Sequence, residues 1–326
     1  MKILWPHTFN ASEIGSGTFM YTSMMSLNKT GIRPDLLYLG NLRQPSTWIS
    51  ARRQIRCAFE QADLLHCQWG SAAGYVSGIS ARKPKILSLR GSDWTPASSS
   101  RIKQRAHAAL ATRLTRLSIP KYDAIICMSR RMAREVSDLY PTMKIYVIPD
   151  PVDTEQFCPM EQTAARALLN LADQGHKYVL FGSLKTHNAL KRKELAIGAV
   201  EYARRIHPLV SLLPIHGIPH EQVRLYLAAC DATICTSVSE GWPNIIKESL
   251  ACNLPFISTD VSDLKEIAEH DSHCRVADPT AEALGSKLAE LLHKRRPDHL
   301  SRYIADMTIE NHGKQLRDCY LEIISK

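Results

Sequence analysis

Residues 232–251 read ATICTSVSEGWPNIIKESLA, and this stretch carries the most information in the chain. Its first five residues are apolar or β-branched and predict a buried strand. Gly241 then permits a tight turn, and Pro243 has the fixed φ that is favoured at the first position of a helix, where backbone amides can bind an anion. Because carboxylates repel phosphate, Glu240 before this helix and Glu248 within it are better suited to sugar hydroxyls. The stretch therefore predicts a nucleotide-sugar site.

The composition indicates a globular protein with room for two domains. The chain has 326 residues, of which 44% are apolar. No apolar run approaches the length of a membrane span, and the opening residues 1–6 read as a first strand rather than as a signal peptide. Nine cysteines, an odd number without a Cys-x-x-Cys pair, indicate reduced and mostly buried thiols. We therefore expect a cytoplasmic protein.

Short apolar runs alternate with helical stretches along the whole chain, which is typical of α/β folds with parallel sheets. In the first half the expected strands are 2–6, 35–39, 63–67, 85–89, 123–128 and 144–148. In the second half they are 177–182, 210–214, 232–236, 255–258 and 275–277. Prolines at 149 and 151 mark a crossing between two domains. Two doubly wound domains that face each other leave a cleft at the carboxyl ends of their strands, where ligands bind in this architecture.

The excess of positive over negative charge is confined to the first half of the chain. Residues 1–165 carry 21 Lys and Arg against 12 Asp and Glu, whereas residues 166–326 carry 20 of each. This asymmetry is either a simple basic surface or a means of attracting an anionic partner, such as inner-leaflet lipid or a lipid-linked phosphate. No pattern of interleaved basic and aromatic residues supports nucleic acid as that partner.

The spacing Glu240-x7-Glu248, placed after a strand that ends in Cys-Thr-Ser-Val-Ser, resembles the family 4 glycosyltransferases. These are retaining enzymes with the GT-B fold, in which two Rossmann-like domains face each other across a cleft. The resemblance implies an acceptor domain at 1–158, a donor domain at 159–305 and a C-terminal helix at 306–326 that packs back on the first domain. It also implies that Glu240 contacts the donor sugar and Glu248 the nucleotide ribose. The backbone of Gly241, Trp242, Pro243, Asn244 and Ile245 would approach the sugar and the diphosphate.

A second element of the resemblance is Gly182-Ser183, followed by Lys191-Arg192-Lys193. Family members usually carry Arg directly after this glycine and Lys some residues later, and both stabilise the leaving diphosphate. Ser183 replaces that Arg here, so Lys193 is the best match to the family lysine, with Arg192 or Lys191 as the second cation. Cations at a helix start oppose the helix dipole, which favours an anionic ligand over a solvated surface. His216 and Ile218 are expected to line the base pocket.

The first domain carries three further candidate segments. Gly15-Ser16-Gly17 matches a glycine-rich loop that in the family lies near the sugar diphosphate, although a plain turn explains it as well. His66 stands at a strand end that often carries His, and is either a site residue or a packed histidine. Arg90 replaces a family His that commonly lies against the donor sugar. It could bind phosphate or an acidic acceptor but cannot act as a base.

Asp93, close to Arg90, either orients an acceptor hydroxyl or caps a local turn. The segment Ile148–Phe157 resembles the family hinge, with Asp150 and Pro151 in place of the usual Asn and Gly. We expect this segment to be structural rather than catalytic.

The resemblance implies transfer of a sugar from a nucleoside diphosphate to a hydroxyl acceptor, with the anomeric configuration retained. We expect no metal and no cofactor, because the basic residues would supply the positive charge. The expected setting is bacterial cell-envelope polysaccharide or lipopolysaccharide assembly, with a lipid-linked or saccharide acceptor and the anionic inner membrane face as a peripheral location. Two alternatives stay open: a non-catalytic scaffold that binds sugar nucleotides, and a GT-B nucleotide-sugar epimerase.

Overall fold

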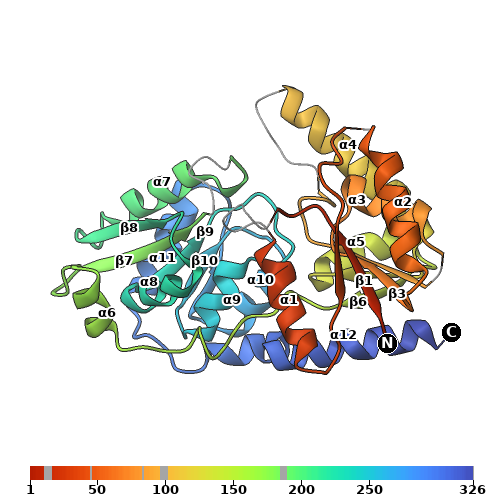
Figure 1. The fold of residues 1–326 in the computed structure, drawn as a ribbon. Coiled ribbons are helices and arrows are strands. Elements are labelled where there is room, and N and C mark those ends of the chain that lie inside the picture. Colours follow the sequence, from red (N-terminus) through yellow and green to blue (C-terminus); the bar gives the residue numbers. More distant parts are fainter. Residues whose placement is uncertain (11–16, 45, 83, 96–101, 184–188, 326) are drawn as a thin grey trace. The chain divides into compact units, whose positions relative to one another are not determined.

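The computed structural model describes residues 1–10, 17–44, 46–82, 84–95, 102–183 and 189–325. The chain forms two compact α/β units, each built on a parallel sheet (Figure 1). The first unit comprises Met1–Pro151, Glu240–Trp242 and Ile309–Lys326, and the second comprises Val152–Ser239 and Pro243–Thr308. The predicted fold class of two Rossmann-like domains is confirmed.

The sheet of the first unit has six parallel strands in the order β2-β1-β3-β4-β5-β6. These strands are β1 (Ile3–His7), β2 (Asp35–Tyr38), β3 (Leu64–Cys67), β4 (Lys85–Leu89), β5 (Ala124–Cys127) and β6 (Lys144–Val147). All six coincide with the strands predicted from the sequence. β1, β3, β4 and β5 are buried along their whole length, which is why they read as continuous apolar runs rather than as alternating ones.

Helices cover both faces of this sheet. On one face α2 (Thr47–Phe59), α3 (Ser71–Ser80) and α5 (Arg130–Leu139) close a hydrophobic core, and α4 (Ile102–Ser118) packs against α3. The opposite face is covered by α1 (Thr18–Asn28) and α12 (Ile309–Ile324), which pack against each other (Figure 1).

The C-terminal helix α12 is anchored in the first unit by Tyr320. This side chain is fully buried, and its hydroxyl accepts a hydrogen bond from Trp5 Nε1 over 3.1 Å. Burying a large side chain contributes roughly 1.5–3 kcal/mol, so the last helix gains stability from packing against a strand whose Trp5 lies 315 positions earlier in the sequence.

The second unit has five parallel strands in the order β11-β10-β9-β7-β8. They are β7 (Lys177–Gly182), β8 (Val210–Ile215), β9 (Ala232–Cys235), β10 (Phe256–Ser258) and β11 (Cys274–Val276). One face of this sheet packs against α7 (Lys193–Ala203) and α11 (Ala281–Leu292). The remaining helices are α6 (Gln162–Leu168), α8 (Val223–Ala229), α9 (Asn244–Ala251) and α10 (Leu264–His270).

One predicted helix start is wrong by one position. Pro243 is not the first residue of α9 but its N-cap, with a ψ of 116° that lies in the extended region. The helix begins at Asn244, because the cap residue keeps a non-helical backbone while its carbonyl already accepts the first helical bond.

The hinge segment is tied down within the second unit. Val152 forms an isolated parallel bridge with Thr308, and its N–H donates to the Met307 carbonyl over 2.8 Å. The Asp153 carboxylate accepts the N–H groups of Glu155 and Gln156.

Among the described residues, no helix is both long enough and apolar enough to span a bilayer.

Candidate functional site

The carboxyl end of β7 meets the first turn of α9 at very short range. A Cβ placed on Gly182 would lie 2.9 Å from Cγ1 of Ile245 and 3.2 Å from its Cδ1. Only glycine allows this approach, which sets the start of α9 against the strand end. The structure thus brings together two sequence-predicted donor residues that are separated by more than 60 positions.

Glu248 lies in the second turn of α9 and is 8% exposed. Its Oε1 lies 2.8 Å from Nε2 of His220, which belongs to the loop after β8. The hydrogen bond to this carboxylate raises the pKa of His220, and burial of the ring opposes the rise. The other carboxylate oxygen, Oε2, has no hydrogen-bond partner in the described part of the chain. Glu248 is therefore an oriented carboxylate with one oxygen left to accept a hydroxyl.

Two of the predicted cations lie at the start of α7 with different surroundings. Arg192 is the N-cap of α7 and has a left-handed backbone with φ 48°. Its Nε donates to the Thr236 carbonyl (2.6 Å), and its Nη2 donates to the Ser237 carbonyl (2.8 Å). Its guanidinium thereby joins α7 to the loop that follows β9. Lys193 is half-buried, and its ammonium has no hydrogen bond or ion pair with any described residue. Of the two, Lys193 is the cation available to a ligand.

The other donor-side residues follow the ends of β7 and β8, except Lys191, which lies in a short 3-10 helix before α7. Ser183 directly follows β7 and donates its N–H to the Ile215 carbonyl, and the Lys191 carbonyl accepts a hydrogen bond from the Thr236 hydroxyl. His216 is exposed just beyond β8, and Ile218 is half-buried in the same loop. Their predicted contacts with base and diphosphate stay predictions.

Glu240, Gly241 and Trp242 belong to the first unit, whereas the motif from Pro243 onward belongs to the second. Trp242 is buried and Glu240 is half-buried. The predicted contact of Glu240 with the donor sugar also stays a prediction.

The glycine-rich loop is described only from Gly17, because Gly15 and Ser16 lie outside the described residues. Gly17 is the N-cap of α1 with φ 73°, and a Cβ there would lie 2.8 Å from Cβ of Phe9. Both the left-handed backbone and the close approach to Phe9 require glycine at this position.

Arg90 is buried and bonded on every side within the first unit. Its Nε donates to the Gln68 carbonyl (2.9 Å), its Nη2 to Gln68 Oε1 (2.8 Å) and its Nη1 to the Asp150 carboxylate. The guanidinium also lies 4.1 Å from the ring centre of Phe19. Burial lowers the pKa of Arg90 to about 9, although Asp93 and Tyr320 act in the opposite direction. In this structure the guanidinium is a structural cation.

Asp93 performs the capping role that the sequence left open. It is 1% exposed, and its carboxylate accepts the N–H groups of Gly70 (2.9 Å), Arg90 (2.9 Å) and Gly91 (3.0 Å). Burial raises the pKa of Asp93, while the hydrogen bonds from Gly70 and Arg90 and the charge of Arg90 lower it and partly compensate. The carboxylate holds the loops after β3 and β4 together.

His66 is a packed histidine, the second of the two readings that its position allowed. Its Nδ1 lies 2.5 Å from the Tyr320 hydroxyl and its Nε2 2.8 Å from the Ser88 hydroxyl. Burial lowers the pKa of His66 well below its usual range, and the nearby charges of Arg90 and His312 act in the same direction. A neutral imidazole thus joins β3, β4 and α12.

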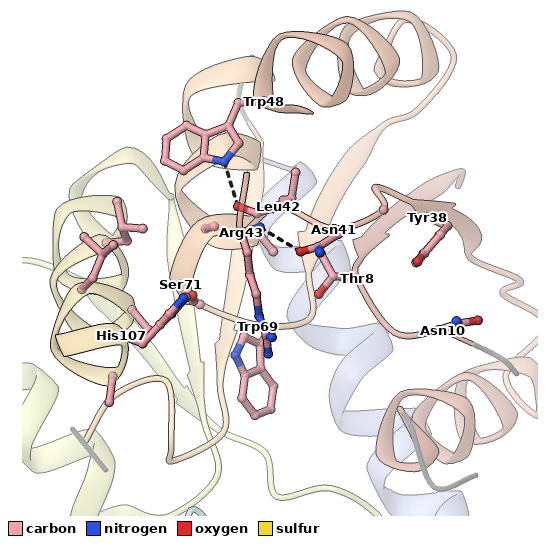
Figure 2. A pocket seen from close by; sticks show the side chains of 18 residues that line it. Thr8, Asn10, Tyr38, Asn41, Leu42, Arg43, Trp48, Trp69, Ser71 and His107 are labelled. Atoms are coloured by element: carbon pink, nitrogen blue, oxygen red, sulfur yellow. Dashed lines mark hydrogen bonds between the residues drawn. The ribbon is translucent and has the colours of Figure 1, made fainter. Parts of the chain in front are cut away.

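A pocket that the sequence did not predict lies in the first unit, over the carboxyl ends of β1, β2 and β3 (Figure 2). It has a volume of about 790 Å³, within the range of small-molecule sites. Its walls come from the loops after the three strands and from α2, α3 and α4. They comprise Thr8, Asn10, Tyr38, Gly40, Asn41, Leu42, Arg43, Trp48, Trp69, Gly70, Ser71, Ala72, Ala73, His107, Ala108, Leu110, Ala111 and Leu114.

One signal in the sequence could have found part of this pocket. Trp69 stands two residues beyond β3, where the loops of a parallel sheet collect ligand contacts. Nothing comparable singles out Arg43 or His107, which reach the same pocket from the loop after β2 and from α4.

The second unit also contains one group of possible metal ligands among its described residues. Asp271, His273 and His299 place ligand atoms within 4.8 Å of one another. The Asp271 carboxylate is already bonded, with His299 Nε2 at 2.8 Å and His273 Nδ1 at 3.2 Å. Arg302 donates to the same carboxylate over 3.3 Å. No motif in the sequence marks this cluster, because its members lie up to 28 residues apart.

Comparison with known proteins places the chain in a family. A model described as Glycosyltransferase Family 4 matches residues 22–156, and one described as Glycosyl transferases group 1 matches residues 203–307. TuaC of Bacillus subtilis (strain 168), a glycosyltransferase assigned to teichuronic acid biosynthesis, is 26% identical over 250 residues. That match covers 72% of this chain and 62% of the relative's length.

Two solved structures share the fold over nearly their whole length. Sucrose-phosphate synthase from Thermosynechococcus elongatus matches with a TM-score of 0.75 and 15% identity, covering 100% of this chain and 99% of that one. HepE from Anabaena, in complex with UDP and glucose, matches with a TM-score of 0.68 and 15% identity, covering 99% and 100%. The fold, the motif around Glu248 and the two family models together identify this chain as a member of the family 4 glycosyltransferases of GT-B fold.

Proposed function

We propose that this protein transfers a sugar from a nucleoside diphosphate sugar to a hydroxyl of a saccharide acceptor, with retention of the anomeric configuration. The observation that carries the proposal is the buried Glu248 carboxylate, which His220 orients and which keeps Oε2 without a partner among the described residues. An oriented carboxylate oxygen of this kind is suited to accept hydrogen bonds from ribose hydroxyls. HepE, which shares the fold, is known in complex with UDP-glucose, and this supports a nucleotide-sugar donor.

The chemistry requires positive charge at the leaving group. The bond between the anomeric carbon and the diphosphate oxygen breaks, the acceptor oxygen forms the new bond, and the acceptor proton passes to the leaving phosphate. Negative charge grows on the diphosphate during this step, so a fixed cation stabilises the transition state. The ammonium of Lys193 at the start of α7, which has no partner among the described residues, would supply this charge. We therefore propose that transfer needs no divalent ion and no cofactor.

The setting proposed for the reaction is the assembly of a bacterial cell-envelope glycan, as the role of TuaC suggests. The basic first half of the chain supports binding to an anionic membrane surface. Neither α2 nor α4 contains an acidic residue, and both expose large apolar side chains, Ile49 at 79% and Leu110 at 54%. Co-sedimentation with phosphatidylglycerol vesicles, but not with phosphatidylcholine vesicles, at moderate salt is the expected result. Equal sedimentation with both would contradict it.

Thermal shift against UDP, GDP and ADP, each with and without its sugar, tests the donor site. One nucleotide should raise the Tm of the wild type, and Glu248→Gln should weaken its binding by about tenfold, the loss expected for one hydrogen bond to a charged group. Glu282→Gln, an exposed carboxylate on α11, is the matched control and should behave as wild type. Equal shifts in Glu248→Gln and the wild type would overturn the ribose assignment.

Nucleotide release tests whether the chain is an enzyme rather than a scaffold. The wild type should release nucleotide in an acceptor-dependent manner, and Glu240→Ala should abolish release. Turnover without any acceptor and with an epimerised sugar would favour the epimerase alternative, and binding without turnover would favour the scaffold. If EDTA abolished transfer and a divalent ion restored it, the role given to Lys193 would be wrong.

A further inference from the structure

The described lining of the pocket over β1, β2 and β3 contains a basic side chain and no acidic one. None of the 18 residues that line it is acidic, and Arg43 brings a guanidinium to its wall. Arg43 is exposed, and its side chain has no ion pair or hydrogen bond with any residue that the structure describes. A guanidinium without a carboxylate partner among the described residues, in a pocket whose described lining carries no negative charge, favours an anionic ligand that it can hold with two parallel N–H donors.

The same pocket has a fixed aromatic wall. The ring of Trp69 packs against Phe9, with 5.9 Å between ring centres, and against Phe19, with 5.8 Å. These contacts fix one edge of the indole, while Figure 2 shows the ring among the side chains that line the pocket, with the side chain of Arg43 extending toward it. A sugar ring presents C–H groups on its faces, so an aromatic surface fixed in this way is a suitable platform for it.

The loop that carries Arg43 is also held in place. Asn41 Oδ1 accepts the backbone N–H of Arg43 over 3.0 Å, and the Asn41 carbonyl accepts the Thr47 hydroxyl over 3.0 Å. Nε1 of Trp48 donates to the Leu42 carbonyl over 2.9 Å (Figure 2). The base of the Arg43 side chain is therefore ordered before a ligand arrives, which lowers the entropic cost of binding.

We propose that this pocket binds the acceptor, that the acceptor carries a carboxylate or phosphate group held by Arg43, and that Trp69 stacks against the sugar ring beside that group. The inference rests on the proposed transfer reaction and names the class of its acceptor. A carboxylate would come from a uronic acid, and a phosphate from a phosphorylated sugar or a lipid-linked sugar phosphate. Both offer the paired oxygens that a guanidinium recognises.

Direct binding measured by tryptophan fluorescence and by saturation-transfer NMR tests the proposal without the donor. The probes are a hyaluronan tetrasaccharide against its carboxyl-reduced, neutral counterpart, and glucose 6-phosphate against glucose. The proteins are the wild type, Arg43→Gln, Arg43→Lys and Arg53→Gln. Arg53 is an exposed arginine of α2 outside the pocket lining, so Arg53→Gln matches the change in net charge.

The wild type should bind at least one acidic probe about ten- to a hundredfold more tightly than its neutral counterpart, as one charge-assisted pair allows. Arg43→Gln should lose this preference, Arg43→Lys should restore part of it, and Arg53→Gln should keep it. Preference for the tetrasaccharide identifies the anion as a carboxylate, and preference for the sugar phosphate identifies it as a phosphate. Absence of any preference in the wild type, or a preference that survives in Arg43→Gln, overturns the proposal.

Failure of the acidic-acceptor proposal can be distinguished from failure of the transfer proposal. If nucleotide release proceeds equally well with the acidic and the neutral saccharide, transfer stands and the acidic acceptor falls. If Arg43 governs binding of the acidic saccharide but no nucleotide is ever released, the transfer proposal falls and the pocket is an acidic-saccharide site of another function.

Discussion

Arg90 and Asp150 form an ion pair inside the first unit, with the guanidinium Nη1 donating to the Asp150 carboxylate. Both side chains are largely buried, at 5% and 13% exposure. Each is also a departure from the pattern that family 4 sequences usually show, His at the first position and Asn at the second. The two departures therefore compensate each other, because a buried guanidinium needs a carboxylate that an Asn would not supply.

The pair predicts a coupled effect on stability. Asp150→Asn leaves the buried Arg90 charge without its partner and should lower the free energy of unfolding by about 3 kcal/mol. Arg90→His combined with Asp150→Asn restores the usual pair, and should cost clearly less than the sum of the two single changes. Urea denaturation of the wild type, both single variants and the double variant measures this cycle. Strict additivity would contradict the coupling.

The hydrogen bond between His220 and Glu248 predicts a pH dependence. Because the folded pKa of His220 is raised above its unfolded value, the imidazolium is stabilised in the fold. This contribution is fully present below the unfolded pKa of about 6.5 and is lost as the pH rises through the folded pKa. The difference in unfolding free energy between wild type and His220→Gln should therefore shrink from pH 6 to pH 8.

An NMR titration of the His220 ring checks the sign of this prediction directly. A midpoint above that of a model peptide, returning to the ordinary value in Glu248→Gln, is the expected outcome. A difference between wild type and His220→Gln that grows with pH would show that the assignment is wrong.

Lys193 predicts an effect on the rate rather than on substrate binding. If its ammonium stabilises charge that develops on the leaving diphosphate, Lys193→Gln should lower kcat by about 10²–10³-fold with a smaller change in KM. Lys193→Arg should recover part of the rate, and Lys265→Gln on the exposed side of α10 should have none of these effects. A rise in KM alone would show that Lys193 binds the ground state and the transition state equally and does not accelerate the chemical step.

Gly182 predicts a packing effect at the junction of β7 and α9. In Gly182→Ala the new methyl group meets Ile245, and the overpacking should cost about 1–3 kcal/mol of stability and weaken nucleotide binding. Adding Ile245→Ala removes the clashing atoms. Measured by calorimetry, the double variant should therefore lose less stability than the sum of the losses in the two single variants. If Gly182→Ala were as stable as the wild type, the close approach of Ile245 would not require glycine at position 182.

The sequence by itself determined the strands, the two-domain α/β class and the family. Strand and helix patterns depend on local residue spacing, so all eleven expected strands coincide with strands of the structure. The motif around Glu240 and Glu248 is also local, and its glycine and glutamate spacing can be read without a fold. The predicted helix start at Pro243 differs from the observed one by a single position, and that of the C-terminal helix, expected at 306 and observed at Ile309, by three.

Tertiary structure alone decided what the polar side chains do. Arg90, Asp93 and His66 are all candidate site residues by sequence, yet each is buried and bonded to at least one group more than 20 positions away. These distant partners are Gln68 and Asp150 for Arg90, Gly70 for Asp93, and Ser88 and Tyr320 for His66. The pocket of Arg43 and Trp69 likewise collects residues from three loops and three helices. Burial and hydrogen-bond partners arise from contacts between distant segments, so no spacing of residues along the chain could reveal them.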